Sequence, residues 1–163
     1  MKPAKIFLDT NVLLYQTFED IDAEKHALVN ATLRALFDQQ HQLYISTQIV
    51  REFIALATND AILKTPLRND DVLLKISEFE TNFVVLFETP QSLQILKTLF
   101  QRYEIKKYRV HDANIAATVL AKIDVEVGHR HAFGIEKALE QQIVRNGIEI
   151  GNAQRPCYNR PRP

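Results

Sequence analysis

The 163-residue chain contains no tryptophan and a single cysteine, Cys157. One cysteine excludes an internal disulfide and any zinc site built from several thiolates, and it fits a reducing compartment. No apolar run approaches the roughly 20 residues that a membrane helix needs. The first residues run into an apolar, strand-like stretch with no signal peptide before it. We therefore expect a cytoplasmic protein with no membrane partner.

An excess of charge of one sign is also missing. Lys and Arg total 20, Asp and Glu total 20, and the formal net charge is zero. That balance gives no support for tight, non-specific nucleic-acid binding, although local patches can still supply it. Glycine and proline are scarce, at 4 and 6 residues, and no linker rich in glycine or serine divides the chain. The 46% hydrophobic content is ordinary for a domain with one real core.

Strand-like and helix-like stretches alternate along most of the chain. The expected strands are short apolar runs at Ile6–Leu8, Leu43–Ile45 and Phe83–Phe87. The expected helices are Ala23–Gln40, Gln48–Thr58 with Ser46 or Thr47 as its cap, Asn69–Glu80 with Asn69 and Asp70 as start signals, a helix begun by Thr89 and Pro90, and His111–Lys122. This alternation predicts an α/β fold, a three-layer α/β/α sandwich with a mostly parallel central sheet.

The last third of the sequence has weaker patterns. Val125 and Val127 are compatible with a strand, Gly134–Arg145 with a helix and Gly147–Ile150 with a short edge strand. The end of the chain is rich in Pro, Arg and Asn and has no apolar period. We therefore predict a single domain over residues 1–150 and a flexible, basic, proline-rich tail over residues 151–163.

Three acidic residues occupy similar points in the alternation. Asp9 ends the first strand, Glu52 lies in the helix after the second strand, and Asp112 opens the helix after the basic residues 106–109. In a parallel α/β sheet, the carboxyl ends of strands and the amino ends of the following helices face one crevice. Carboxylates gathered there repel one another unless a cation binds, and oxygen ligands favour Mg²⁺ or Mn²⁺. A hydrated ion of this kind can activate water against a phosphodiester.

Each acid also has an ordinary structural explanation. Asp9, Thr10 and Asn11 are residue types that begin helices and cap turns. Glu52 can face solvent on its helix. Asp112 can be explained by its favourable interaction with the helix dipole alone. The spacing of the acids leaves both interpretations open.

The sequences around these acids resemble a known family. The stretches LDTNVLLY with Asp9, VREFIALA with Glu52 and HDANIAATVLA with Asp112 are similar, in order and separation, to PIN-domain ribonucleases, especially the VapC-type toxins of bacterial toxin–antitoxin pairs. The resemblance covers residues 4–122. It implies an α/β/α fold, a Mg²⁺ or Mn²⁺ site formed by the three acids with support from Thr10 and Asn11, and endonucleolytic cleavage of RNA. It also implies a cognate antitoxin and a homodimer.

The chain departs from the family pattern after Lys122. The family has a strand ending in Thr or Ser followed by Asp or Asn, whereas this chain has IDVEVGHRHAFGIEKALEQQ. Glu136 is our preferred replacement for the fourth polar ligand, with Asp124 and Glu126 as alternatives, or the position is empty. An empty position would favour a second hypothesis, a catalytically impaired PIN-like module that binds RNA or a protein. A third hypothesis, a phosphatase of another α/β family, would want an acid where Asn11 stands.

Other polar residues have two interpretations each. Lys106, Lys107 and Arg109 form a basic connector just before Asp112, which can hold RNA phosphates or be an ordinary solvated loop. The histidines are interpreted as surface residues, because their spacing matches no helical metal-binding pair: His111, His129 and His131.

The early apolar residues suggest a possible interface. The run from Val12 to Tyr15 and the helix that follows offer more apolar surface than one sheet face needs, which indicates either a partner interface over residues 12–37 or core packing.

Overall fold

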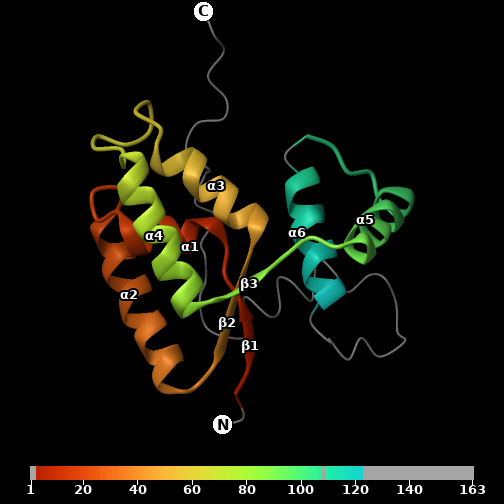
Figure 1. Cartoon of the computed structure of the whole chain (residues 1–163), viewed down its shortest axis with the longest axis horizontal. Helices are drawn as coiled ribbons and strands as arrows, with labels where there is room; N and C mark the ends of the chain where they lie inside the picture. The colour runs from red at the N-terminus through yellow and green to blue at the C-terminus, as the bar shows by residue number, and fades with distance from the viewer. Residues whose placement is uncertain (1–2, 108, 123–163) are drawn as a thin grey trace, which may run out of the picture.

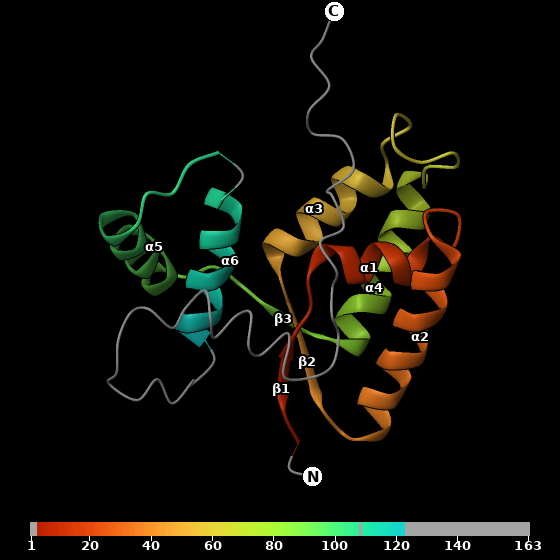
Figure 2. The same cartoon turned by 180° about the vertical axis from the view of Figure 1, so that it is seen from behind.

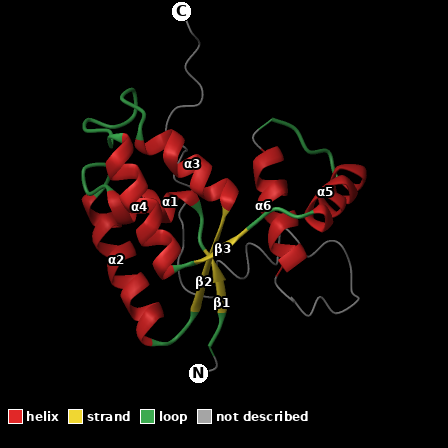
Figure 3. Cartoon of the chain, in the orientation of Figure 1, coloured by secondary structure: helices red, strands yellow, loops and turns green. Residues whose placement is uncertain are grey.

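The computed structural model describes residues 3–107 and 109–122 (Figures 1 and 3). Its elements are, in order, β1 (Lys5–Phe7), α1 (Thr10–Thr17), α2 (Ala23–Asp38), β2 (Gln42–Ser46), α3 (Thr47–Ala57), α4 (Asn69–Asn82), β3 (Val84–Leu86), α5 (Pro90–Arg102) and α6 (Arg109–Lys122). Glu136, its alternatives Asp124 and Glu126, the elements expected beyond Lys122 and the predicted tail lie outside the described residues.

The three strands form a parallel sheet with β2 in the middle. Lys5 pairs with Gln42 between β1 and β2, and Tyr44 pairs with Val84 between β2 and β3. Helices α1 to α4 cover one face of the sheet, and α5 and α6 lie on the other (Figures 1 and 2). The predicted α/β/α architecture with a parallel sheet is confirmed.

The strand residues supply both faces by simple alternation. Successive side chains of a strand point to opposite faces of the sheet. Ile6 and Ile45 therefore join the core under α1 to α4, whereas Phe7, Tyr44 and Leu86 contact α6 on the other face. Because both faces are covered by helices, the strands read as continuous apolar runs.

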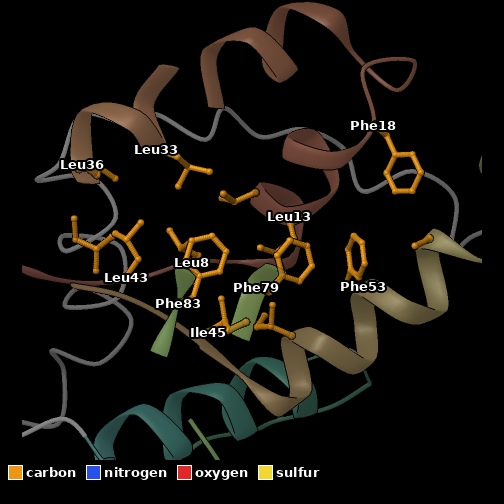
Figure 4. Close-up of a cluster of buried hydrophobic side chains, with 14 of the residues drawn as sticks. Leu8, Leu13, Phe18, Leu33, Leu36, Leu43, Ile45, Phe53, Phe79 and Phe83 are labelled. Atoms are coloured by element: carbon orange, nitrogen blue, oxygen red, sulfur yellow. The ribbon is translucent and has the colours of Figure 1, made fainter. Parts of the chain in front are cut away.

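A chain of aromatic rings runs through the larger core (Figure 4). Phe53 and Phe79 meet edge to face with their ring centroids 5.0 Å apart, which is a preferred arrangement of aromatic pairs. Phe18 lies 6.5 Å from Phe53, and Phe83 lies 6.0 Å from Phe79. These rings tie α3, α4 and the start of β3 together beneath the sheet.

The helix starts follow the predicted caps in two of the cases. The Ser46 hydroxyl accepts a hydrogen bond from the Ile49 amide at the start of α3. Thr89 and Ser92 form a reciprocal capping box around Pro90 at the start of α5. Both starts could be predicted because the stabilising contact spans only three residues.

Some predicted helix boundaries are wrong. Helix α4 begins at Asn69 as predicted, after an Arg68 N-cap that makes no side-chain cap bond, but it ends at Asn82 rather than Glu80. Helix α6 begins at Arg109 rather than His111, so the basic connector runs into the helix. Helix α2 ends at Asp38 rather than Gln40.

The apolar residues of α1 are largely core. Val12 and Leu13 are 7% and 0% exposed, so these two belong to the packing beneath the sheet rather than to an interface. On α2, by contrast, Leu28 is 63% exposed and Phe37 is 40% exposed. Within the described part of the chain, no helix has the length and apolarity to span a membrane.

Candidate functional site

Asp9 lies at the carboxyl end of β1, in the N-cap position of α1. A capping aspartate normally accepts hydrogen bonds from the first helical amides. The Asp9 side chain makes no such cap bond. Its Oδ2 atom instead accepts a hydrogen bond from Asn11 Nδ2 at 3.3 Å. This half-buried carboxylate therefore occupies the N-cap position without capping the helix through its side chain, and it contacts Asn11 instead.

Glu52 is held to the same edge from α3. Its Oε2 atom accepts a hydrogen bond from Thr10 Oγ1 at 2.8 Å, and its Oε1 atom accepts one from Gln48 Nε2 at 3.0 Å. Thr10 is only 5% exposed, and Glu52 is half-buried. The solvent-facing explanation for Glu52 is therefore wrong. Since Thr10 follows Asp9 in the chain, this contact brings the first two acidic motifs together.

Asp112 lies in the first turn of α6 and is exposed. Ile115 and Val119, three and seven residues further on, occupy the same stripe of the helix and pack against the sheet. The stripe places Asp112 one turn beyond these contacts, toward the carboxyl ends of the strands. Beside it, His111 Nδ1 lies 3.1 Å from Gln48 Nε2. The third acidic motif is thus joined to the second through Gln48.

A second group of polar side chains adjoins these contacts. Arg51 Nη2 donates hydrogen bonds to Gln48 Oε1 at 2.8 Å and to Glu88 Oε1 at 2.5 Å. Asn114 Nδ2, on α6, donates to the same Glu88 oxygen at 3.1 Å. The hydrogen bond from Arg51, followed by that from Asn114, lowers the pKa of Glu88 below its ordinary value. Glu88 is therefore ionised at neutral pH.

The sequence analysis did not single out Gln48, Arg51, Glu88 and Asn114. Two of them carry a signal that could have been used. Glu88 follows β3 at the same point at which Asp9 follows β1, and Gln48 precedes Glu52 by one helical turn. For Arg51 and Asn114 there is no such signal, because their role depends on how α3 and α6 meet.

The basic connector borders a shallow hollow of about 290 Å³, lined by Glu104, Lys106, Lys107 and Arg109. Lys106 forms an ion pair with Glu104. Arg109 lies one helical turn before Asp112, on the same side of α6. The connector thus stands next to the acidic motif, and RNA binding by its three basic residues stays a prediction.

The chemistry of the acids suits a hard cation, since their donors are all oxygens. Among the residues described, however, no three side chains of His, Cys, Asp or Glu are grouped closely enough to hold an ion. Metal binding by Asp9, Glu52 and Asp112 therefore stays a prediction. So do the supporting roles of Thr10 and Asn11 in such a site, although both contact an acid of it.

The fold and the polar edge define a class: a parallel α/β/α domain with acidic side chains at the carboxyl ends of its strands. No family model matches the sequence, and no curated protein matches it either. Among solved structures, the chain is similar to the crystal structure of VapBC2 from Rickettsia felis bound to a DNA fragment from its promoter. The identity is 14%, the match covers 73% of this chain and 81% of that one, and the TM-score is 0.46. Likeness of this degree assigns the chain neither a family nor an activity.

Proposed function

We propose that this chain is a metal-dependent endoribonuclease that acts as the toxin of a toxin–antitoxin pair. One observation carries the proposal: a run of hydrogen-bonded side chains, from Thr10 through Glu52 and Gln48 to His111, connects the three acidic motifs. These motifs are far apart in the sequence, and their local sequences resemble PIN-domain ribonucleases. Their convergence at one sheet edge is what a shared hydrolytic site requires.

The acids would hold Mg²⁺ or Mn²⁺. A carboxylate oxygen has two lone pairs, so the hydrogen bonds from Thr10 and Gln48 leave acceptor capacity on both Glu52 oxygens. Mg²⁺ is usually bound by one or two carboxylates and completes its shell with water. Asp9, Glu52 and Asp112 therefore need not form a tight cluster. When bound, the ion would activate a water molecule and stabilise the leaving oxygen of the phosphodiester.

The surrounding residues would orient the acids and the RNA. Asn11 steadies the Asp9 carboxylate, and Thr10 and Gln48 fix that of Glu52. The basic side chains beside Asp112 would hold backbone phosphates, which positions an RNA without reading its sequence: Lys106, Lys107 and Arg109. We propose Glu136 as a fourth acid. An antitoxin and a second copy of the chain are the proposed protein partners.

The test is cleavage of a mixed RNA pool by the full chain, purified free of any partner. We expect slow cleavage that Mn²⁺ supports better than Mg²⁺, because Mg²⁺ demands near-ideal octahedral geometry. Asp9→Asn should lower the rate by roughly 100-fold, since loss of a ligand removes several kcal/mol of charge stabilisation. Glu136→Gln should lower it as well if Glu136 supplies the fourth ligand.

Glu78→Gln, on the exposed surface of α4, is the matched control and should leave the rate unchanged. Cleavage that survives Asp9→Asn would place the activity elsewhere. If no divalent metal supports cleavage, the enzyme is excluded and the binding module becomes the better account.

A further inference from the structure

The attachment of α6 differs along its length. Ala113, Ala116 and Ala117 of α6 pack against Leu99 of α5, and these residues form a cluster separate from the larger core. It reaches the sheet through a smaller cluster that includes Val119. Its first four residues, Arg109 to Asp112, are exposed. Apolar packing of Ala113 and Ile115 therefore fixes the body of α6, whereas the exposed turn that carries Asp112 meets α3 through a polar contact between His111 and Gln48.

Polar contacts join this end of α6 to α3. Glu88, in the segment between β3 and α5, accepts hydrogen bonds both from Arg51 of α3 and from Asn114 of α6. Arg51 also donates to Gln48, which in turn donates to Glu52. A continuous set of hydrogen bonds thus runs from α6, through Glu88 and Arg51, to the Glu52 carboxylate.

We propose that Arg51 and Glu88 are positioning residues that hold α6 against α3, so that Asp112 and Glu52 can bind one metal ion together. The proposal rests on the proposed function and adds to it a pair of residues that do not themselves touch the ion. Glu88 links the two helices because a single oxygen accepts from both Arg51 and Asn114.

The exposure of the pair separates positioning from stability. The side chains of Arg51 and Glu88 are 56% and 41% exposed. Ion pairs this exposed add little to global stability because water and salt screen them. Removing a residue that orients a metal ligand, by contrast, often changes metal affinity by 10-fold or more, and Arg51 is linked to Glu52 through Gln48. The effect of the pair should therefore appear in metal binding rather than in the melting temperature.

The experiment measures Mn²⁺ affinity by calorimetry for the full chain, Arg51→Ala, Glu88→Ala and the double variant. Simple electrostatics predicts opposite changes, since removing a positive charge favours a cation and removing a negative charge disfavours it. Positioning predicts that both single variants bind Mn²⁺ more weakly, by roughly 10-fold. The double variant should be no weaker than either single variant, because residues that act as a unit are not additive.

The Lys75–Glu78 pair provides the matched control, since it is an exposed ion pair of 2.7 Å on α4. Lys75→Ala and Glu78→Ala should leave Mn²⁺ affinity unchanged. Opposite changes in Arg51→Ala and Glu88→Ala, or unchanged affinity in both, would overturn the proposal while leaving the proposed function intact.

Hydrogen exchange gives a readout that does not depend on metal. Amides in the first turns of α6 should exchange faster in Arg51→Ala and Glu88→Ala than in the wild type and the Glu78→Ala control. If the wild type fails to bind Mn²⁺, the proposed metal site is lost and this measurement alone judges the contact. Unchanged exchange would then overturn it.

Discussion

Gln48 shows at the residue scale how one side chain orients a carboxylate. Its amide nitrogen donates to Glu52 and lies within hydrogen-bond distance of His111 Nδ1, and its oxygen accepts from Arg51. A flipped amide would place its oxygen against the Glu52 carboxylate and its NH₂ group against the Arg51 guanidinium. Both contacts would be repulsive, so the arrangement permits one amide orientation and fixes the direction of Glu52.

Asp22, the N-cap of α2, makes the stability of the fold depend on pH. Its carboxylate accepts a hydrogen bond from the Lys25 amide at 3.1 Å and pairs with Lys25 Nζ at 3.0 Å. These bonds lower the pKa of Asp22 in the folded chain. Because the folded pKa lies below the unfolded one, the carboxylate stabilises the fold above about pH 4. That contribution is lost as the pH falls through the folded pKa.

We therefore expect Asp22→Asn, which retains a capping side chain, to be less stable than the wild type at pH 7. The difference should shrink as the pH falls below about 4, and it should also shrink in 1 M salt. Urea unfolding at a series of pH values measures it. Asp60→Asn, in the exposed loop after α3, is the control expected to match the wild type at pH 7. A difference for Asp22→Asn that persists unchanged in acid would contradict this account of the cap.

The end of α2 shows how an element stops where the sequence gives no signal. The amide of His41 donates to the Leu36 carbonyl and that of Gln40 to the Phe37 carbonyl, the pattern of a Schellman motif. Gln40 has a φ of 59°, in the left-handed region, where glycine is the usual residue. We expected the helix to continue to Gln40, and no glycine in the sequence marks its end.

Replacing this residue tests the local strain. A residue with a Cβ atom in the left-handed region costs roughly 1–2 kcal/mol, and glycine gives part of this back as chain entropy. Gln40→Gly should therefore stabilise the fold by roughly 0.5–1 kcal/mol and raise the melting temperature by about 1–4 °C. Gln39→Gly is the control, since Gln39 has a φ of −82° and gains nothing from glycine. A lower melting temperature for Gln40→Gly would contradict the strain.

The elements themselves were largely predictable from local patterns. The strands are short apolar runs, and the starts of α3 and α5 depend on side chains within three residues. The α6 start was harder to predict, because Arg109 and Val110 are exposed and show no apolar period. Lys107 also adopts a φ of 55° just before the helix, a conformation that its residue type does not suggest.

In the molecule as a whole, the topology explains why the meeting of acidic side chains at one sheet edge could be partly predicted. Parallel strands with crossover helices bring their carboxyl ends to one edge, whatever the side chains are. That rule alone predicts that Asp9 and Glu52 lie at the same edge of the sheet. It could not give the contacts of Arg51 and Asn114 with Glu88, since those depend on how two separate apolar clusters meet across the sheet.

The central claim is that the acidic edge binds a divalent metal, and a calorimetric Mg²⁺ titration of the full chain tests it most directly. The account predicts saturable binding that is at least roughly 10-fold weaker in Asp9→Asn and in Asp112→Asn, because each variant removes a proposed carboxylate ligand. Glu78→Gln should bind as the wild type does. Equal Mg²⁺ affinity in the wild type and Asp9→Asn, or no binding by the wild type, would contradict the account.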